Sequence, residues 1–272
     1  MLKETGIWNK LEHIKPRKAT SGDLALVHTS DAIERIRAFG AGEIDPDTYA
    51  SADSFDVASY AAGAVMEAVE QCRNSGMRRV FCAVRPPGHH AEADRSMGFC
   101  LFNNVAIGAR HARRAGFGKV FIVDFDAHHG NGTQHIFEED DKVFYFSTHQ
   151  YPYYPETGRD MERGRGKGEG YTYNVPILAG SGNKDYLTVY QDILPGVIQR
   201  FGPDIILVSA GYDIHAHDPH ANIRVTHEGI HGIVRSILAS ADVPMVFVLE
   251  GGYDLPSLCD SVKITIEEML RQ

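Results

Sequence analysis

The chain has 272 residues, of which 43% are hydrophobic and 23% charged, and its formal net charge at pH 7 is −9. This length is sufficient for one large α/β domain with its own core, so we expect a single domain over residues 1–272. The negative charge argues against general binding to nucleic acids, and no apolar run approaches the roughly 18 residues needed to cross a membrane.

The amino-terminal part is predicted to consist of helices and a loop. Residues 5–37 are expected to form short helices with polar connections, and residues 40–54, rich in Gly, Asp and Pro, are expected to form a loop. Ser54 is positioned to cap a helix that runs to about Cys72, with a stripe of Ala, Val and Met facing a sheet.

Further along the chain, apolar runs alternate with helical patterns. Strands are expected at residues 79–84, from 120 onward, and at 142–147, 204–209 and 244–249. The intervening helices are expected to end near residue 114, to cover 183–200 and 226–240, and to close the chain. This alternation predicts a mostly parallel central sheet between two helical layers, a three-layer α/β/α fold without a linker or internal repeat.

A glycine-rich tract covers residues 164–170. It lacks the interleaved aromatic residues of an RNA-binding segment and the spacing of a dinucleotide-binding fingerprint, so we expect a mobile surface loop.

Four cysteines lie far apart in the sequence: Cys72, Cys82, Cys100 and Cys259. Because they lack the spacing of a zinc or redox motif, reduced and mostly buried thiols are expected. The amino terminus lacks the apolar core of a signal peptide, so the sequence predicts a cytoplasmic protein.

The segment from Val120 to Thr133 carries the strongest chemical signal. It begins as a continuous apolar run and then turns into a sequence containing Asp124, Asp126 and His128. These three residues alternate, so in an extended chain their side chains point to one side. Buried carboxylates need compensation, and mixed oxygen and nitrogen donors suit zinc. The alternative is a hydrogen-bonded core histidine beside a capped turn.

Other polar clusters also follow strands, and the carboxyl ends of parallel strands share one edge of the sheet. His89 and His90 follow one predicted strand and are candidate general bases, while Tyr253 follows the last strand and offers a phenol. Three residues are candidate zinc ligands that leave a coordination position for water: Asp126, His128 and Asp213. This combination predicts metal-assisted hydrolysis of a carbonyl compound.

Five motifs in this order resemble those of the zinc-dependent histone deacetylase family. They are Arg-Pro-Pro-Gly-His-His, Gly-Phe-Cys, Asp-Phe-Asp-Ala-His-His-Gly-Asn-Gly-Thr, Ala-Gly-Tyr-Asp and Glu-Gly-Gly-Tyr. The family includes bacterial deacetylase-like amidohydrolases and acetylpolyamine amidohydrolases and shares its fold with arginase. The resemblance covers the chain from about Asp45 onward and implies the arginase–deacetylase fold, with an amino-terminal edge that is expected to be truncated. Asn131 resembles the class II and bacterial branch.

The resemblance implies roles for individual residues. Asp126, His128 and Asp213 match the zinc ligands, and Tyr253 matches the tyrosine that hydrogen-bonds the scissile carbonyl oxygen. One zinc ion per chain is expected rather than the two metals of arginase, because His215 stands where arginase has a second carboxylate.

The tandem histidines are expected to differ in charge. By the family pattern, His89 pairs with Asp124 and His90 with Asn131. A carboxylate partner favours the imidazolium form, whereas a neutral amide does not. His90 is therefore the expected proton shuttle, and His89 is expected to act as a positively charged orienting group.

Further contacts are implied by the resemblance alone. The residues expected to contact substrate are Asp45, Gly98, Phe99, Tyr154, His220 and Gly252. One monovalent-cation (K⁺ or Na⁺) site is expected to use Asp124, Asp126, His128, Ser147 and Thr148. A second is expected to use Phe137, Asp140, Val143 and Tyr171.

The sequence thus predicts a zinc-dependent amidohydrolase that removes acetyl or other acyl groups from lysine side chains, in a peptide or protein. One alternative is an amidohydrolase of acylated polyamines or other small molecules. Another, of a different class, is an inactive module that binds acyl-lysine or a partner. No nucleic-acid or membrane partner is expected, and self-association into a homo-oligomer is left open.

Overall fold

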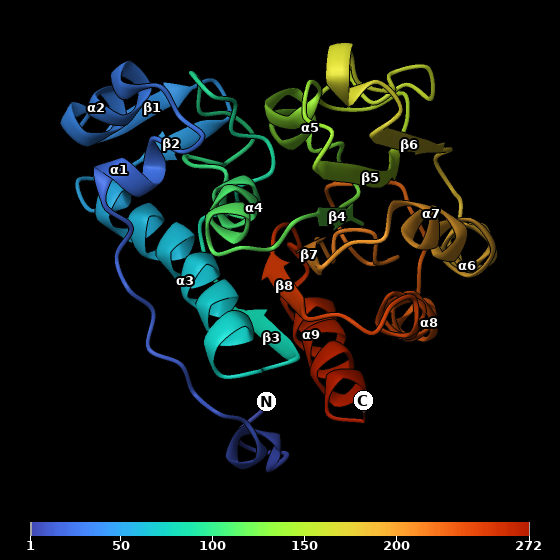
Figure 1. Cartoon of the computed structure of the whole chain (residues 1–272). Coiled ribbons are helices and arrows are strands. Elements are labelled where there is room, and N and C mark those ends of the chain that lie inside the picture. Colours follow the sequence, from blue (N-terminus) through green and yellow to red (C-terminus); the bar gives the residue numbers. More distant parts are fainter. Residues whose placement is uncertain (1, 272) are drawn as a thin grey trace.

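The structure, a computed structural model, describes residues 2–271. Its centre is a six-stranded sheet in the order β3-β8-β7-β4-β5-β6, in which every neighbouring pair is parallel (Figure 1). The strands are β3 (Arg79–Cys82), β4 (Val120–Asp124), β5 (Val143–Gln150), β6 (Thr172–Ile177), β7 (Ile205–Ala210) and β8 (Met245–Leu249).

Helices cover both faces of the sheet (Figure 1). One layer contains α3 (Ser54–Asn74), α4 (Asn104–Arg114) and α5 (Asn131–Phe137). The other contains α6 (Asn183–Thr188), the π-helical η3 (Val189–Ile193), α7 (Leu194–Phe201), α8 (His227–Ala239) and α9 (Leu255–Met269). The predicted three-layer α/β/α fold is therefore confirmed.

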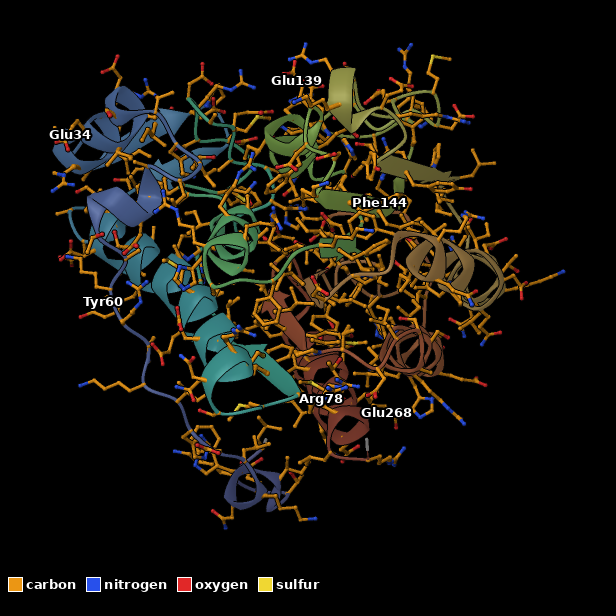
Figure 2. The ribbon with its side chains drawn as sticks, in the orientation of Figure 1. Glu34, Tyr60, Arg78, Glu139, Phe144 and Glu268 are labelled. Carbon is orange, nitrogen blue, oxygen red and sulfur yellow. The ribbon has the colours of Figure 1, made fainter. Side chains whose placement is uncertain are left out.

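The central strand β4 joins the two halves of the core. Its side chains alternate, so Ile122 packs with the cluster formed by α3 and α4, whereas Phe121 and Val123 pack with α7 and α8. Phe144 of β5 stacks on Phe121 with ring centroids 4.9 Å apart and lies inside the fold, while Glu34 and Glu139 project outward (Figure 2). Burial on both faces explains why β4 is apolar throughout up to Asp124.

The amino-terminal segment contains a hairpin that the sequence did not predict. The expected short helices are η1 (Ile7–Lys10), α1 (Ser21–Leu24) and α2 (Ser30–Ala38). Within the predicted loop, β1 (Gly42–Asp45) pairs in antiparallel fashion with β2 (Thr48–Ala50). The Asp-Pro-Asp sequence forms the turn between them, so residues that favour loops here close a hairpin.

Two boundaries differ from the predictions. Ser54 is the first residue of α3, and its hydroxyl accepts a hydrogen bond from the Ser51 amide (2.8 Å) rather than capping the helix. β5 runs to Gln150 because it pairs along its end with β6, which was not predicted. β6 is an edge strand, so its burial is interrupted and it tolerates Pro176, which hides it from a search for apolar runs.

The glycine tract is a surface segment with a short 3₁₀ turn, η2 (Gly166–Gly168). The Arg165 amide donates to the Glu138 carbonyl oxygen (2.6 Å), and the Arg165 side chain pairs with Glu138 and Glu139. The tract is therefore held against the end of α5, and its mobility stays a prediction.

All four cysteines are free thiols. Cys72, Cys82 and Cys100 are buried, as expected, and Cys259 is exposed. Within residues 2–271, no helix is both long and apolar enough to cross a membrane.

His28 is a buried histidine that predicts acid sensitivity. Its Nδ1 donates to the Glu92 carbonyl oxygen (2.9 Å), and its Nε2 accepts from the Asn103 amide (2.9 Å), so the ring is held neutral. Burial lowers its pKa from 6.5 to about 4. Because the unfolded chain then binds the proton more readily, stability present above pH 6.5 is lost as the pH falls through about 4. The loss is about 3 kcal/mol at ~1.4 kcal/mol per pKa unit.

We expect the free energy of unfolding of His28→Gln to fall less between pH 7 and pH 4 than that of the unchanged chain, because a glutamine amide does not titrate. Urea unfolding of the metal-free protein at pH 7, 5 and 4 measures it. The exposed His13 provides the matched control, His13→Gln, which should retain the slope of the unchanged chain. Equal slopes for His28→Gln and the unchanged chain would contradict the assignment.

Candidate metal and hydrolytic site

The three predicted metal ligands meet at the carboxyl ends of β4 and β7. Asp126 and His128 lie in the turn after β4, and Asp213 lies just after β7. Their donor atoms all lie within 4.8 Å of one another. The His128 Nδ1 atom is 2.8 Å from Asp213 Oδ2 and 3.1 Å from Asp126 Oδ1. The structure thus brings the three predicted ligands together from segments 85 residues apart.

Two glycines make room for these carboxylates. A Cβ atom on Gly211 would lie 2.0 Å from Asp126 Oδ2, and one on Gly251 would lie 2.6 Å from Asp213 Oδ2. The Gly251 amide donates to Asp126 Oδ2 (2.9 Å), and the Ala127 amide donates to Asp213 Oδ1 (2.8 Å). The glycines of the Ala-Gly-Tyr-Asp and Glu-Gly-Gly-Tyr motifs are therefore required by close approach of the backbone.

The electrostatics of this group fit a divalent cation. Asp126 and Asp213 are fully buried next to each other, and burial together with the Asp126 charge raises the pKa of Asp213 to about 7. Two buried acids with one imidazole form the oxygen and nitrogen donor set that zinc prefers. Among residues 2–271, this is the single group of three or more such side chains close enough to hold an ion.

Asp124 lies beside this group and supports a histidine. β4 ends at Asp124, and the residues after it form a turn rather than the extended chain assumed from the alternation. Asp124 Oδ2 is 3.0 Å from His89 Nδ1 and accepts from the Tyr145 hydroxyl (3.0 Å), while its Oδ1 accepts from the Asp126 amide (3.2 Å). The pairing of Asp124 with His89 inferred from the resemblance is thus present.

The two histidines have different partners and opposite pKa shifts. His90 Nδ1 donates to Asn131 Oδ1 (2.8 Å). Burial opposes protonation of both rings, but the charges of Asp124 and Asp126 outweigh it at His89 and raise its pKa to about 10. At His90, burial and the neighbouring His89 hold the pKa well below its usual value. A charged His89 beside a neutral His90 is what the partner chemistry predicted.

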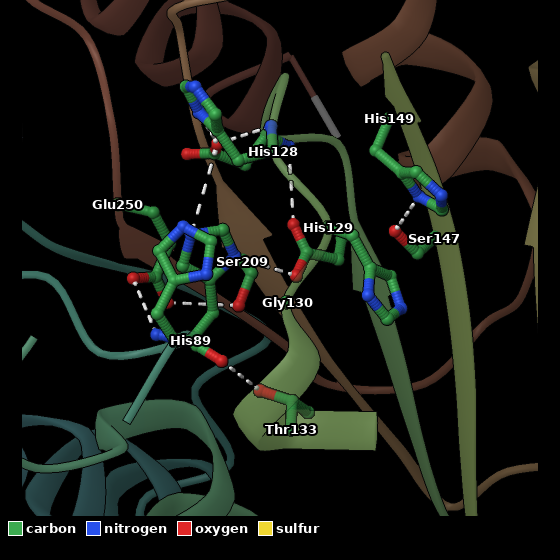
Figure 3. Close-up of polar contacts among 12 residues, drawn as sticks. His89, His128, His129, Gly130, Thr133, Ser147, His149, Ser209 and Glu250 are labelled. Carbon is green, nitrogen blue, oxygen red and sulfur yellow. Dashed lines mark hydrogen bonds and ion pairs between the residues drawn. The ribbon is translucent and has the colours of Figure 1, made fainter. Parts of the chain in front are cut away.

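Glu250 is a buried carboxylate that the sequence did not single out. It accepts hydrogen bonds from the Gly88 amide (2.6 Å), the His89 amide (3.2 Å) and the Ser209 hydroxyl (3.0 Å) (Figure 3). Burial raises its pKa to about 7. It ties the histidine turn to β7 and β8, and an acid at the end of a buried strand was the available signal.

A cavity of about 220 Å³ opens over the metal-binding group. Its lining consists of Asp47, His90, Gly98, Phe99, His128, Tyr153, Tyr154, His220 and Tyr253. The predicted walls Gly98, Phe99 and Tyr154 and the predicted rim residue His220 are therefore in one cavity with His90 and Tyr253.

The acid of the cavity is Asp47 rather than the predicted Asp45. Asp47 Oδ1 accepts from the Gly98 amide (2.9 Å), and its Oδ2 accepts from the Tyr154 hydroxyl (2.7 Å). Asp45 lies at the end of β1 and lines a separate polar cavity with Arg35 and Arg95. The hairpin turn between the two acids directs them to different cavities.

Tyr253 lies against the other wall. Its ring is 4.3 Å from that of His220 and 5.8 Å from that of Phe99, between centroids. Its amide donates to Asp218 Oδ2 (2.6 Å), which fixes the loop after β8. The preceding Gly252, predicted to contact substrate, is not part of the cavity lining, and a Cβ atom added to it would lie 2.9 Å from Leu258 Cδ1.

The predicted monovalent-cation sites stay predictions. Register pairs Asp124 with Ser147 across β4 and β5, next to Thr148, which bonds the Tyr190 hydroxyl (2.9 Å). In the second set, Asp140 accepts from the Lys142 amide (2.8 Å) and pairs with Arg110. The other members of that set, Phe137, Val143 and Tyr171, lie on α5, at the start of β5 and just before β6.

The sequence is similar to that of known proteins over most of its length. Residues 1–269 match the histone deacetylase domain, a wider range than the motifs from Asp45 onward cover. Histone deacetylase 14, chloroplastic, of Arabidopsis thaliana is 46% identical over 233 residues, covering 82% of this chain and 55% of that protein. A probable deacetylase of Methanothermobacter thermautotrophicus is 45% identical over 251 residues, covering 90% of this chain and 75% of that protein.

The fold agrees as well. The solved structure of the HDA15 HD domain superposes with a TM-score of 0.95 and 37% sequence identity, over all of this chain and 81% of that one. By sequence and fold, the chain belongs to the histone deacetylase family, whose members are hydrolases that act on amide bonds.

Proposed function

We propose that this chain is a zinc-dependent deacylase that removes acetyl or related acyl groups from lysine side chains. One observation carries the proposal: one cavity is lined by a candidate metal ligand, His128, by a histidine whose pKa is lowered, His90, and by a phenol, Tyr253. These are the groups that amide hydrolysis requires within reach of one carbonyl carbon.

The residues would divide the work as follows. Zinc, held by Asp126, His128 and Asp213, would supply Lewis acidity toward a carbonyl oxygen and a water molecule. His90 carries its proton on Nδ1, so its Nε2 accepts the proton of the attacking water and later gives it to the departing amine.

His89 and Tyr253 stabilise the negative charge that develops during the reaction. His89 keeps its proton beside Asp124 and contributes a fixed positive charge near the reacting atoms. Burial and the charges of the nearby acids raise the pKa of Tyr253, so its hydroxyl stays protonated and donates to the oxygen on which negative charge develops.

The cavity favours an acyl-lysine over an acylated polyamine. Phe99 and Tyr154 offer aromatic walls for a methylene chain, at about 0.8 kcal/mol per buried CH₂ group. The one carboxylate in the lining, Asp47, has both oxygens occupied by Gly98 and Tyr154. The lining therefore offers a second ammonium group no carboxylate other than this one, which is already engaged by two donors.

A kinetic comparison tests the proposal. The zinc-loaded protein is given fluorogenic acetyl-lysine peptides and N-acetylated polyamines, with and without a chelator. We expect hydrolysis that the chelator abolishes and zinc restores, with kcat/KM at least about ten-fold higher for the peptides. A reversed preference would favour the polyamine amidohydrolase, and binding of acetyl-lysine peptide without hydrolysis would favour the inactive module.

Other expectations from the sequence are part of this proposal and stay predictions. They concern the cytoplasmic location, the K⁺ or Na⁺ ions and the absence of nucleic-acid and membrane partners. Self-association into a homo-oligomer remains an open alternative.

A further inference from the structure

Asn131, the partner of His90, has a second partner that determines which way its amide faces. Its Oδ1 accepts from His90 Nδ1 (2.8 Å), and its Nδ2 donates to Glu92 Oε1 (2.5 Å). Asn131 is 3% exposed and His90 is 4% exposed, so the hydrogen bond between them is shielded from water, whereas Glu92 also lines the separate polar cavity beside Asp45. If the amide were reversed, its NH₂ group would face His90, which would then have to carry its proton on Nε2.

Glu92 removes this ambiguity because a carboxylate only accepts hydrogen bonds. Its contact with the Asn131 NH₂ group, at 2.5 Å, is shorter than those of the His90 carbonyl oxygen and Met97 Sδ, both at 3.4 Å, so Glu92 contributes most to turning the NH₂ group away from the His90 ring. Glu92 is itself held in place: its Oε1 also accepts from His135 Nδ1 (2.9 Å), and its carbonyl oxygen accepts from His28 Nδ1 (2.9 Å). Its amide donates to the Arg95 carbonyl oxygen (2.8 Å), which closes the loop.

We propose that Glu92 is a positioning residue that fixes the amide orientation of Asn131 and, through it, the Nδ1-protonated tautomer of His90. That tautomer leaves His90 Nε2 free to act as a base in the cavity. Glu92 does not line the substrate cavity, so it acts on the proton transfer and not on substrate binding. The catalytic consequence rests on the proposed function, whereas the tautomer does not.

Kinetics in two backgrounds separate this role from simple support of the loop. Glu92→Ala removes the shortest contact that orients the Asn131 amide and leaves only the two 3.4 Å contacts, so kcat should fall about ten-fold with KM unchanged. Glu92→Gln keeps an accepting oxygen and should restore most of kcat. In the Asn131→Asp background, either oxygen accepts from His90 and the new carboxylate faces Glu92. In this background, Glu92→Ala removes the repulsion between the two neighbouring carboxylates and should raise kcat several-fold.

Glu70 supplies a matched control. Like Glu92, it is a carboxylate that bonds one histidine, His111 (2.7 Å), and one asparagine amide, Asn74 (2.8 Å). Glu70 lies near the carboxyl end of α3, which leads into the start of β3. It is therefore close to the amino ends of the strands, whereas the site lies at their carboxyl ends. Glu70→Ala should leave kcat unchanged in both backgrounds.

Ring nitrogen NMR of the zinc-loaded protein, labelled with ¹⁵N-histidine, reads the tautomer directly. The His90 signals are identified by their loss in His90→Asn. They should report a proton on Nδ1 in the unchanged chain and a mixture of tautomers in Glu92→Ala. An unchanged tautomer, or an equal fall of kcat in both backgrounds, would overturn the proposal. If the protein hydrolyses no amide, the proposed function fails and the NMR result still decides the role of Glu92.

Discussion

Tyr253→Phe is expected to lower kcat about 10²–10³-fold, the usual cost of removing one donor to a developing oxyanion. The aromatic ring keeps its contacts with His220 and Phe99, so the wall of the cavity and KM should change little. Zinc content should be unchanged because Tyr253 is not among the metal-binding side chains. Steady-state kinetics on an acetyl-lysine peptide, with metal analysis of the same sample, measures both effects.

Tyr173→Phe is the control for this experiment. Tyr173 lies on the edge strand β6, where its ring stacks on Phe146, and it is 38% exposed. Loss of the Tyr173 hydroxyl should leave kcat within about two-fold of that of the unchanged chain, because this hydroxyl is not part of the cavity. Unchanged turnover in Tyr253→Phe would remove Tyr253 from the mechanism.

Asp213→Asn is expected to have an effect at least as large, through the metal. It removes one of two buried carboxylates from the group that holds the cation, so zinc binding should weaken and kcat/KM should fall by roughly 10³-fold. In the metal-free protein, by contrast, we expect the same substitution to stabilise the fold. The amide that replaces the Asp213 carboxylate carries no charge, so the cost of burying a charge there, which is the main reason that the pKa of Asp213 is raised, disappears together with the repulsion from Asp126. The free energy of unfolding near neutral pH should therefore rise.

Calorimetric titration with zinc and urea unfolding in chelator test the two parts separately. Asp204→Asn is the matched control, because Asp204 precedes the same strand, β7, at its other end and accepts from the Lys119 amide (2.8 Å). It should bind zinc normally. Full zinc affinity in Asp213→Asn would contradict the assignment of Asp213 as a ligand.

The sequence predicts five of the six strands of the central sheet, including the edge strand β3, but misses β6 and the separate hairpin of β1 and β2. β4, β7 and β8 are buried on both faces, so they appear as continuous apolar runs. β6 lies at the edge and alternates in burial, and the hairpin of β1 and β2 is made of residues that also favour loops. Local patterns do not record which segments a strand pairs with, and that pairing determines both elements.

The same limit applies to the site. Asp126, His128 and Asp213 were predictable because parallel strands deliver their carboxyl ends to one edge. Asp45 and Asp47 are two residues apart in one polar turn, and only the hairpin decides which of them reaches the cavity. Glu250 binds the backbone of the histidine turn more than 160 residues away, a partner that no local pattern records.

The carboxylate of Asp47 links the two sides of the cavity entrance, so that they can move only together. Because one oxygen anchors Gly98 and the other anchors Tyr154, neither side can retreat without breaking a contact shared with the opposite side. Inhibitors with bulky linkers would therefore have to strain both flanks together, whereas slender ones would enter without distortion. Asp47 is thus the residue that makes the cavity discriminate between thick and slender linkers. An Asp47→Ala variant, in which the entrance is free to widen, is the reference against which this discrimination can be measured.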